Sequence, residues 1–363
     1  MSEVTSKLRT ASKSIGYNAT TYGIVIVFYA LMMGLKSAGM LSNSVQGFLV
    51  PVCAYVVMAI SLNLTVGIMG ELSLGHAGFM SVGAFTGVVM AAVLQNAVPL
   101  GGLRLALSMV VGGICAGLVS LIVVVPVLRL RGDYLAIVTL AFGEIIRNII
   151  QCLYIGIDEN GLHMAMSETN LHLAEAGRVV VRGPMGAVGI QKLASLTAGF
   201  ILIMLTLLVV LNLVHSRHGR AIMALRDNRI AAESIGISPV RYKIIAFVTS
   251  AVLAGMAGTL YAMNFSSILA KKFDFNTSIL VLVFVVLGGM GDIRGSIIAA
   301  AALTILPELL REYADYRMLV YAIVLILVML ATNNPTLKNL LGDLSRKLPK
   351  SRMAQKKKGG AAK

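Results

Sequence analysis

Long apolar runs alternate with short polar stretches over most of the chain. A helix that crosses a bilayer needs about 20 apolar residues, and ten runs approach that length, although the last two are short. We predict an all-α polytopic membrane bundle of about ten transmembrane helices, occupying residues 21–336. The expected spans begin near residues 21, 43, 67, 103, 133, 193, 244, 276, 296 and 317.

The third expected span opens with an unusual number of glycines. Residues 67–85 read GIMGELSLGHAGFMSVGAF and contain five of them. Glycine weakens a helix, and irregular backbone at membrane depth is tolerated only where it is buried in protein or lines a cavity. We therefore predict a broken helix. The segment GGMGDIRGS near Gly288 shares the glycine spacing, which favours two related halves or a chance recurrence.

A long polar insert separates the fifth and sixth expected spans. Residues 154–192 contain clustered Asp, Glu and Arg. Such a length is unusual for a bare connection, so we expect short elements of regular structure within it.

A compact charged loop, residues 217–243, separates the sixth and seventh expected spans. Two short helices are expected at 220–228 and 229–235, with Gly236 as a C-terminal cap. Ser238 and Pro239 would then start the next helix as N-cap and first helical residue. A helix pair of this kind can dock into a groove of a partner. A merely solvated connector is the alternative.

Composition supports the membrane assignment. The chain is 57% hydrophobic and 13% charged, with a net charge of +15 and a mean hydropathy of +0.85. Lysine and arginine lie in tails and loops without interleaved aromatic residues, so contact with anionic lipid is expected and nucleic acid is not.

The positive charges also predict an orientation. Of the 31 Lys and Arg residues, 21 fall in the two tails and in loops on the side of residues 217–243, and nine fall on the other side. The positive-inside rule places the basic tails, 1–20 and 337–363, and the charged loop in the cytoplasm. The 154–192 insert would then lie in the periplasm. The loops alone are balanced, so this orientation depends on the tails and on the clustering.

Ionisable residues inside a span often mark a transport pathway. Glu144 and Arg147 are spaced i, i+3 and can share a helix face. An ion pair that holds helices together is the alternative, and Arg147 can also snorkel outward. His76 is either a substrate contact or gate, or a hydrogen-bonded packing residue. Half-helix N-termini can bind carboxylates, which would suit an amino acid at the glycine-rich break. The candidate pathway residues at the break and in the fifth span are Gly70, Ser73, Gly75, His76, Glu144 and Arg147.

Four ordered stretches resemble one family. The segment GRAIMALRDNRIAAESIGISPVRYKIIAFVTSAVLAGMAGTLYA is similar to the coupling-loop region of permease subunits of ABC importers for branched-chain amino acids, in the LivM-type branch. The stretches LNLTVGIMGELSLGHAGF, LRLRGDYLAIVTLAFGEIIRN and VLGGMGDIRGS resemble other recurrent parts of that branch, and the likeness covers about residues 61–330. It departs at Asp158-Glu159-Asn160-Gly161, where the family often has a Thr-Gly-Gly-like turn, so the departure bears on the substrate.

The resemblance implies a multi-pass permease subunit of the bacterial inner membrane, with both termini cytoplasmic and no cofactor of its own. The chain has no GxxxxGK[ST] phosphate loop, so ATP would be hydrolysed by two separate cytoplasmic ATPase subunits. A second permease subunit, paired as a heterodimer, and a periplasmic binding protein would complete the importer. Matched to the family pattern, the residues that contact the ATPase are Arg226, Asp227, Ala231, Ala232, Glu233 and Gly236.

Other interpretations stay open. Glu233 can be an ordinary exposed acid of a helix, and Gly236 is a cap in either case. The same mechanism can serve urea, amides or another small polar solute. An ion-coupled secondary transporter or channel is an alternative of another class, although Glu144 is the only acid well inside a span. The sequence contains no Ser/His/Asp set or metal cluster, so an enzyme is not expected.

Overall fold

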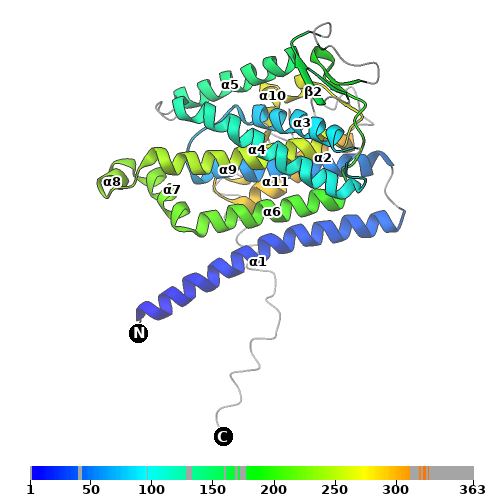
Figure 1. The fold of residues 1–363 in the computed structure, drawn as a ribbon. Helices are drawn as coiled ribbons and strands as arrows, with labels where there is room; N and C mark the ends of the chain where they lie inside the picture. The colour runs from blue at the N-terminus through cyan, green and yellow to red at the C-terminus, as the bar shows by residue number, and fades with distance from the viewer. Residues whose placement is uncertain are drawn as a thin grey trace. The chain divides into compact units, whose positions relative to one another are not determined.

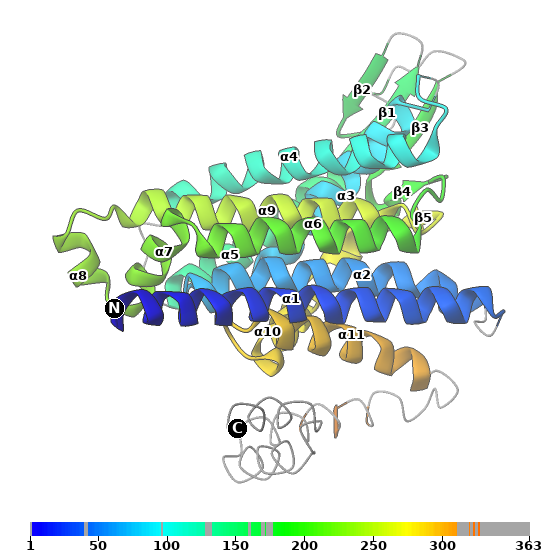
Figure 2. The ribbon, with the colours of Figure 1, turned by 90° about the horizontal axis from the view of Figure 1, so that it is seen from below.

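The apolar runs form helices that lie side by side (Figures 1 and 2). The computed structural model describes residues 2–39, 43–95, 97–127, 133–158, 161–167, 171, 177–310, 319, 322–323 and 326. Nearly all of these belong to the first of the chain's two units, Met1–Ile305. Seven helical stretches of the described residues are long and apolar enough to cross a membrane. They lie in α1 (Ser2–Ser37), α2 (Asn43–Asn63) with its π-helical continuation η1 (Leu64–Ile68), α3 (His76–Val93), α4 (Gly101–Val127), α5 (Asp133–Cys152), α6 (Leu196–His215) and α9 (Pro239–Ala262).

The predicted all-α membrane bundle is confirmed, while the count of ten spans is matched only in part. Helix α10 (Phe275–Gly288) is apolar but short, and α11 (Ile293–Leu309) contains Pro307. The expected tenth span lies largely outside the described residues, as does the expected tail at 337–363. Helix α1 begins at Ser2 and therefore includes the expected N-terminal tail.

Helix α9 packs closely against α3 and α4. Small residues at membrane helix crossings let the backbones approach, and glycines have this role here. Thr259 of α9 donates a hydrogen bond of 2.8 Å to the carbonyl oxygen of Gly83 in α3. A Cβ atom at Gly113 of α4 would lie 2.8 Å from the Cγ of Met256 in α9. Glycine contacts therefore contribute to holding these three helices together.

Helix α2 runs antiparallel to α9. Near the start of α2, the carbonyl of Gly47 accepts a hydrogen bond from Asn264, which follows the end of α9. Near the end of α2, the carbonyl of Ser61 accepts a hydrogen bond from Ser250, in the middle of α9.

Helix α3, by contrast, runs parallel to α9. Phe79 contacts Phe247 edge to face, and further along α3 Gly83 meets Thr259. Residues 69–75, which we call the glycine-rich turn, therefore reverse the chain. The sequence predicted that the second span ends near Gly67, and this is confirmed by the helix that ends at Ile68. It also predicted a break inside the third span, and that prediction is wrong, because α3 is continuous from His76 to Val93 and residues 69–75 lie between the two spans.

The two ends of the bundle differ. Helices α7 (Arg217–Asp227) and α8 (Arg229–Ser234) lie at one end, where α1 also begins, and a small sheet lies at the other (Figures 1 and 2). The sheet confirms that the polar insert has elements of its own, although residues 159 and 160 lie outside the described part. Its five antiparallel strands follow the order β2-β1-β3-β4-β5. They are β1 (Tyr154–Asp158), β2 (Gly161–Ala165), β3 (Arg178–Arg182), β4 (Ala187–Val188) and β5 (Ser267–Ile268).

The crossing of α3 and α5 yields a stability prediction. A Cβ atom at Gly78 would lie 2.8 Å from the Cα of Gly143 in α5, whereas one at Gly102 of α4 meets nothing within 4 Å. Gly78→Ala should lower the free energy of unfolding by about 1–3 kcal/mol, the usual cost of overpacking. Gly102→Ala is the matched control and should have little effect. The test is the melting temperature of each purified protein in detergent, and equal melting temperatures would contradict the proposed close crossing.

Candidate functional site

Helices α7 and α8 form a capped pair, which we call the polar hairpin (Arg217–Ser234). The Ser216 hydroxyl accepts a hydrogen bond of 3.2 Å from the amide of Gly219. The side-chain oxygen of Asn228 accepts one of 3.0 Å from the amide of Ala231. The predicted pair of helices is therefore confirmed. The first helix starts at Arg217 instead of residue 220, because Ser216 supplies an N-cap that the sequence pattern did not single out.

Gly236 follows the polar hairpin and ends its second helix, as expected. This residue has φ +87°, a left-handed conformation that glycine adopts without steric cost. Its amide donates to the carbonyl of Glu233 at 3.0 Å, and the next amide, of Ile237, donates to Ala232 at 3.1 Å. Pro239 then starts α9, but Ser238 makes no side-chain capping bond.

The residues expected to contact an ATPase occupy one end of the molecule but differ in exposure. Asp227, Ala231, Glu233 and Gly236 are exposed, whereas Ala232 is buried. Contact of these residues with an ATPase stays a prediction. The sequence pattern did not single out Ile230 and Ile235, whose side chains are 82% and 75% exposed. The signal for them in the sequence was an apolar residue near each end of a very short polar helix.

Arg226 turns toward the membrane helices instead of away from them. Its Nη1 atom donates a hydrogen bond of 2.8 Å to the carbonyl of Gly67, in η1. The stem of the side chain lies over Gly70, where a Cβ atom would come within 2.6 Å of the Arg226 Cγ. The other edge of the guanidinium bonds Asp227. The structure thus joins two residues that the sequence assigned to separate functions, since Gly70 was placed in the pathway.

A second contact ties the start of α9 to the glycine-rich turn. Lys243, a buried residue in the second turn of α9, forms an ion pair with Glu71. The two side chains are 11% and 17% exposed. The sequence reading singled out neither residue as part of a site, because nothing along the chain indicates that residues 71 and 243 meet.

Two glycine-containing turns meet beside Arg226. Asn63, which is fully buried, accepts a hydrogen bond of 2.8 Å from the amide of Gly291. It also donates to the carbonyl of Asp292 at 3.0 Å and to the hydroxyl of Ser296 at 2.9 Å. One amide side chain therefore joins the end of α2 to residues 289–292, the turn between α10 and α11, which we call the second glycine turn.

The remaining candidates near the glycine-rich turn lie in the protein core. His76 is buried, and its Nε2 atom lies 2.9 Å from the Ser61 hydroxyl. Because that hydroxyl donates to the carbonyl of Met58, the imidazole must donate to Ser61 through Nε2–H. Gly75 packs on the backbone of Thr139 in α5. The Ser73 hydroxyl is buried and has no hydrogen-bond partner among the described residues.

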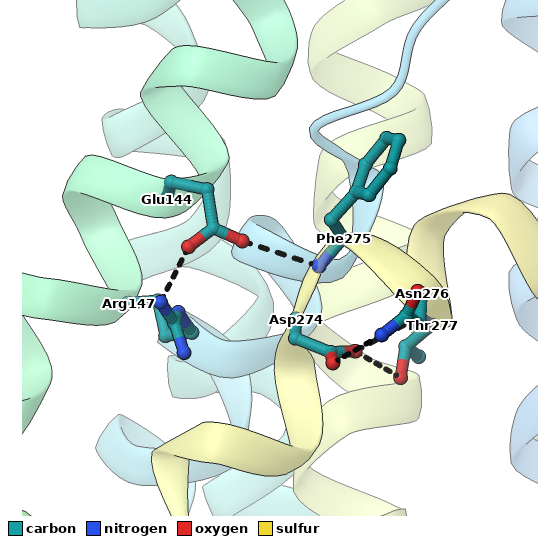
Figure 3. A network of polar contacts seen from close by, with 6 residues as sticks. All are labelled: Glu144, Arg147, Asp274, Phe275, Asn276 and Thr277. Atoms are coloured by element: carbon teal, nitrogen blue, oxygen red, sulfur yellow. Dashed lines mark hydrogen bonds and ion pairs between the residues drawn. The ribbon is translucent and has the colours of Figure 1, made fainter.

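Glu144 and Arg147 form an ion pair on α5 next to the start of α10 (Figure 3). Their closest oxygen and nitrogen atoms are 2.6 Å apart, and the side chains are 29% and 21% exposed. Glu144 also accepts a hydrogen bond of 3.2 Å from the amide of Phe275. Asp274 caps the same helix through the amide of Thr277 at 3.0 Å. The pair therefore bridges two helices and is partly exposed.

This arrangement defines a polytopic α-helical membrane protein with a polar hairpin at one end and a small sheet at the other. The family described as branched-chain amino acid transport system / permease component matches residues 44–329. The chain belongs to this family.

Three relatives show how far the similarity extends. The chain is 36% identical over 291 residues to the high-affinity branched-chain amino acid transport system permease protein LivM of Escherichia coli K12, a match that covers 76% of this chain and 66% of LivM. It is 32% identical over 118 residues to the permease protein LivH of the same organism, covering 32% of this chain and 38% of LivH. It is 30% identical over 104 residues to the fructose import permease protein FruG of Bifidobacterium longum, covering 27% of this chain and 31% of FruG. No solved structure matches the chain.

Two ion pairs with the same N–O distance, Glu144–Arg147 and Arg229–Glu233, differ in exposure and yield a prediction. Arg229 and Glu233 on the polar hairpin are also 2.6 Å apart, but their side chains are 36% and 44% exposed. Such exposed helix pairs contribute about 0.3–0.5 kcal/mol. We expect a larger coupling energy of about 1–2 kcal/mol between Glu144 and Arg147. The measurement is a double-mutant cycle to alanine for each pair, and similar coupling energies for both would contradict the prediction.

Proposed function

We propose that the chain is the transmembrane permease subunit of an ATP-driven ABC importer that carries branched-chain amino acids. The observation that carries the proposal is the capped polar hairpin, which projects at one end of the bundle and is joined to the membrane helices by Arg226. A hairpin with exposed Ile230 and Ile235 offers a partner both an apolar and a charged surface. Family membership over residues 44–329 supports the same class.

In this proposal the chain is not itself an enzyme, and the energy comes from other subunits. The sequence has no phosphate-binding loop, so two cytoplasmic ATPase subunits would bind and hydrolyse ATP. One would grip the polar hairpin, and the other the equivalent hairpin of a second permease. Similarity to both LivM and LivH, two permease proteins of one organism's high-affinity system, supports a heterodimer of related permeases.

The proposed orientation places the polar hairpin in the cytoplasm and the small sheet in the periplasm of a bacterial inner membrane, with both termini cytoplasmic. Two observations support it. The charged loop has the clustered Arg and Lys that favour the cytoplasm, and α1 begins at the same end of the bundle (Figure 2). The sheet would then receive a periplasmic binding protein that delivers the substrate.

The Glu144–Arg147 pair suits a zwitterionic cargo. A free amino acid has one carboxylate and one ammonium group, which match the guanidinium of Arg147 and the carboxylate of Glu144. A charged pair in a span is expected to face protein or water instead of lipid, and its partial exposure leaves it accessible to a solute. Cargo would exchange with the existing ion pair, so that neither charge is left without a partner. Similarity to a fructose permease over 104 residues keeps urea, amides and other small polar solutes as alternatives.

The source of energy separates an ABC importer from an ion-coupled carrier. In cells producing the chain with its proposed partners, uptake of radiolabelled leucine should continue after proton and sodium gradients are collapsed, provided that ATP is maintained. It should stop when ATP is depleted with the gradients intact. A proton-coupled carrier in the same cells is the control. The opposite pattern would favour the secondary-transporter alternative, and competition by urea or acetamide instead of valine would change the assigned cargo.

A single substitution tests whether Glu144 faces the cargo. Glu144→Gln keeps the size of the side chain and removes its charge. We expect uptake to fall about tenfold or more, as when one partner of a charged hydrogen bond is lost, while the amount of protein in the membrane changes little. Arg229→Gln, which breaks the exposed pair of the polar hairpin, is the comparison. Parallel losses of uptake and of protein would support a packing role for Glu144 instead.

A further inference from the structure

The polar hairpin and the start of α9, which follows it in the chain, both contact the region of the glycine-rich turn, each through one charged side chain. Arg226 reaches in from the last turn of α7, and Lys243 from the second turn of α9. These residues stand on either side of α8, Gly236 and the start of α9. The chain is therefore bonded to the membrane helices both before and after α8.

Arg226 holds the end of η1. Its guanidinium is directed at the Gly67 carbonyl, which lies near the C-terminal, negative end of the helix, where a cation is favoured. The π-helix is a rare form that is frequent at functional sites. A larger side chain would not fit at Gly67, because a Cβ atom there would collide with Asn63 and with the backbone of Gly291. Arg226, η1 and the second glycine turn are thus closely packed together.

Lys243 holds the glycine-rich turn itself through Glu71. Both groups are largely shielded from solvent, so removal of one partner would leave the other charge uncompensated. The ion pair fixes α9 to a segment that has no regular secondary structure. Without this pair and the Arg226 bond, residues 69–75 would have fewer links to the elements that surround the hairpin.

The attachment continues toward the candidate pathway. Leu74, in the glycine-rich turn, donates a backbone hydrogen bond of 3.1 Å to the Thr139 hydroxyl of α5. Gly78 packs on Gly143, and the next residue of α5 is Glu144. The described contacts therefore run without interruption from the polar hairpin to the ion pair of α5.

We propose that Arg226 and Lys243 are positioning residues that make the polar hairpin and the glycine-rich turn move as one body, so that displacement of the hairpin reaches α5. This inference rests on the proposed function, because it needs a motor that displaces the hairpin. It gives Arg226 a role inside the permease that does not depend on a direct contact with the ATPase. The hairpin and the ion pair of α5 can be coupled only if both change the equilibrium of one shared structural element.

The test compares Arg226→Ala with Arg241→Ala in the whole importer, reconstituted in proteoliposomes with both permeases, both ATPases and the binding protein. Arg241 is an exposed residue in the first turn of α9, outside the polar hairpin. Arg226→Ala should lower the amount of leucine transported per ATP hydrolysed by about tenfold, within the range for residues along a coupling network. Arg241→Ala should leave the ratio near that of the wild type, and Arg226→Lys should restore part of it. A normal ratio in Arg226→Ala would overturn the proposal.

A second measurement uses the unaltered protein, so it does not depend on the folding of a variant. Hydrogen exchange of the amides of residues 69–75 is followed in the wild-type importer with and without ATP. The proposal predicts that ATP binding leaves exchange in this turn unchanged, because the turn keeps its contacts while it moves, and faster exchange with ATP would overturn it. If the wild-type importer hydrolyses ATP but takes up no leucine, the proposed function is contradicted. If the wild type and Arg226→Ala both transport leucine with the same normal ratio to ATP hydrolysed, only this inference is contradicted.

Discussion

Buried backbone groups that leave a helix must find hydrogen-bond partners within the protein. At the glycine-rich turn, the amide of Leu74 bonds the Thr139 hydroxyl, and the carbonyl of Gly67, at the end of the preceding helix, is bonded by Arg226. At the second glycine turn, Asn63 bonds both an amide and a carbonyl. Each of these partners lies on a different helix. The need to bond irregular backbone therefore decides which helices meet at this end of the bundle.

The same requirement connects the parts of the molecule that we assign to function. The hairpin that would meet an ATPase supplies Arg226, and α5, which carries the ion pair suited to a zwitterionic cargo, supplies Thr139. Glycine allows these elements to approach, at Gly70 beneath the arginine stem and at Gly78 against α5. Such continuity gives a physical route by which a displacement of the hairpin at one end of the bundle can reach the ion pair of α5.

Local signals in the sequence were sufficient for the helices and for the polar hairpin. Period and length of the apolar runs predicted most spans, and Gly236 predicted the end of α8. The boundary between the second and third spans was predicted near Gly67, but the extent of the turn was not, because a cluster of glycines weakens a helix without showing where the next helix begins. Pairs such as Lys243 with Glu71 are distant in sequence and are found only once the fold brings them together. Resemblance to a family indicated the transport class, but not these contacts.

The most direct test of the account is a pair of distances measured with spin labels in the complete importer. Labels at the exposed residues Arg217 of α7 and Leu72 of the glycine-rich turn report whether the two elements move together, and a label at Met166 beside the small sheet is the reference. The account predicts that ATP binding leaves the 217–72 distance unchanged while the 217–166 distance shifts. A change in the 217–72 distance would show the hairpin sliding over the turn and would contradict it.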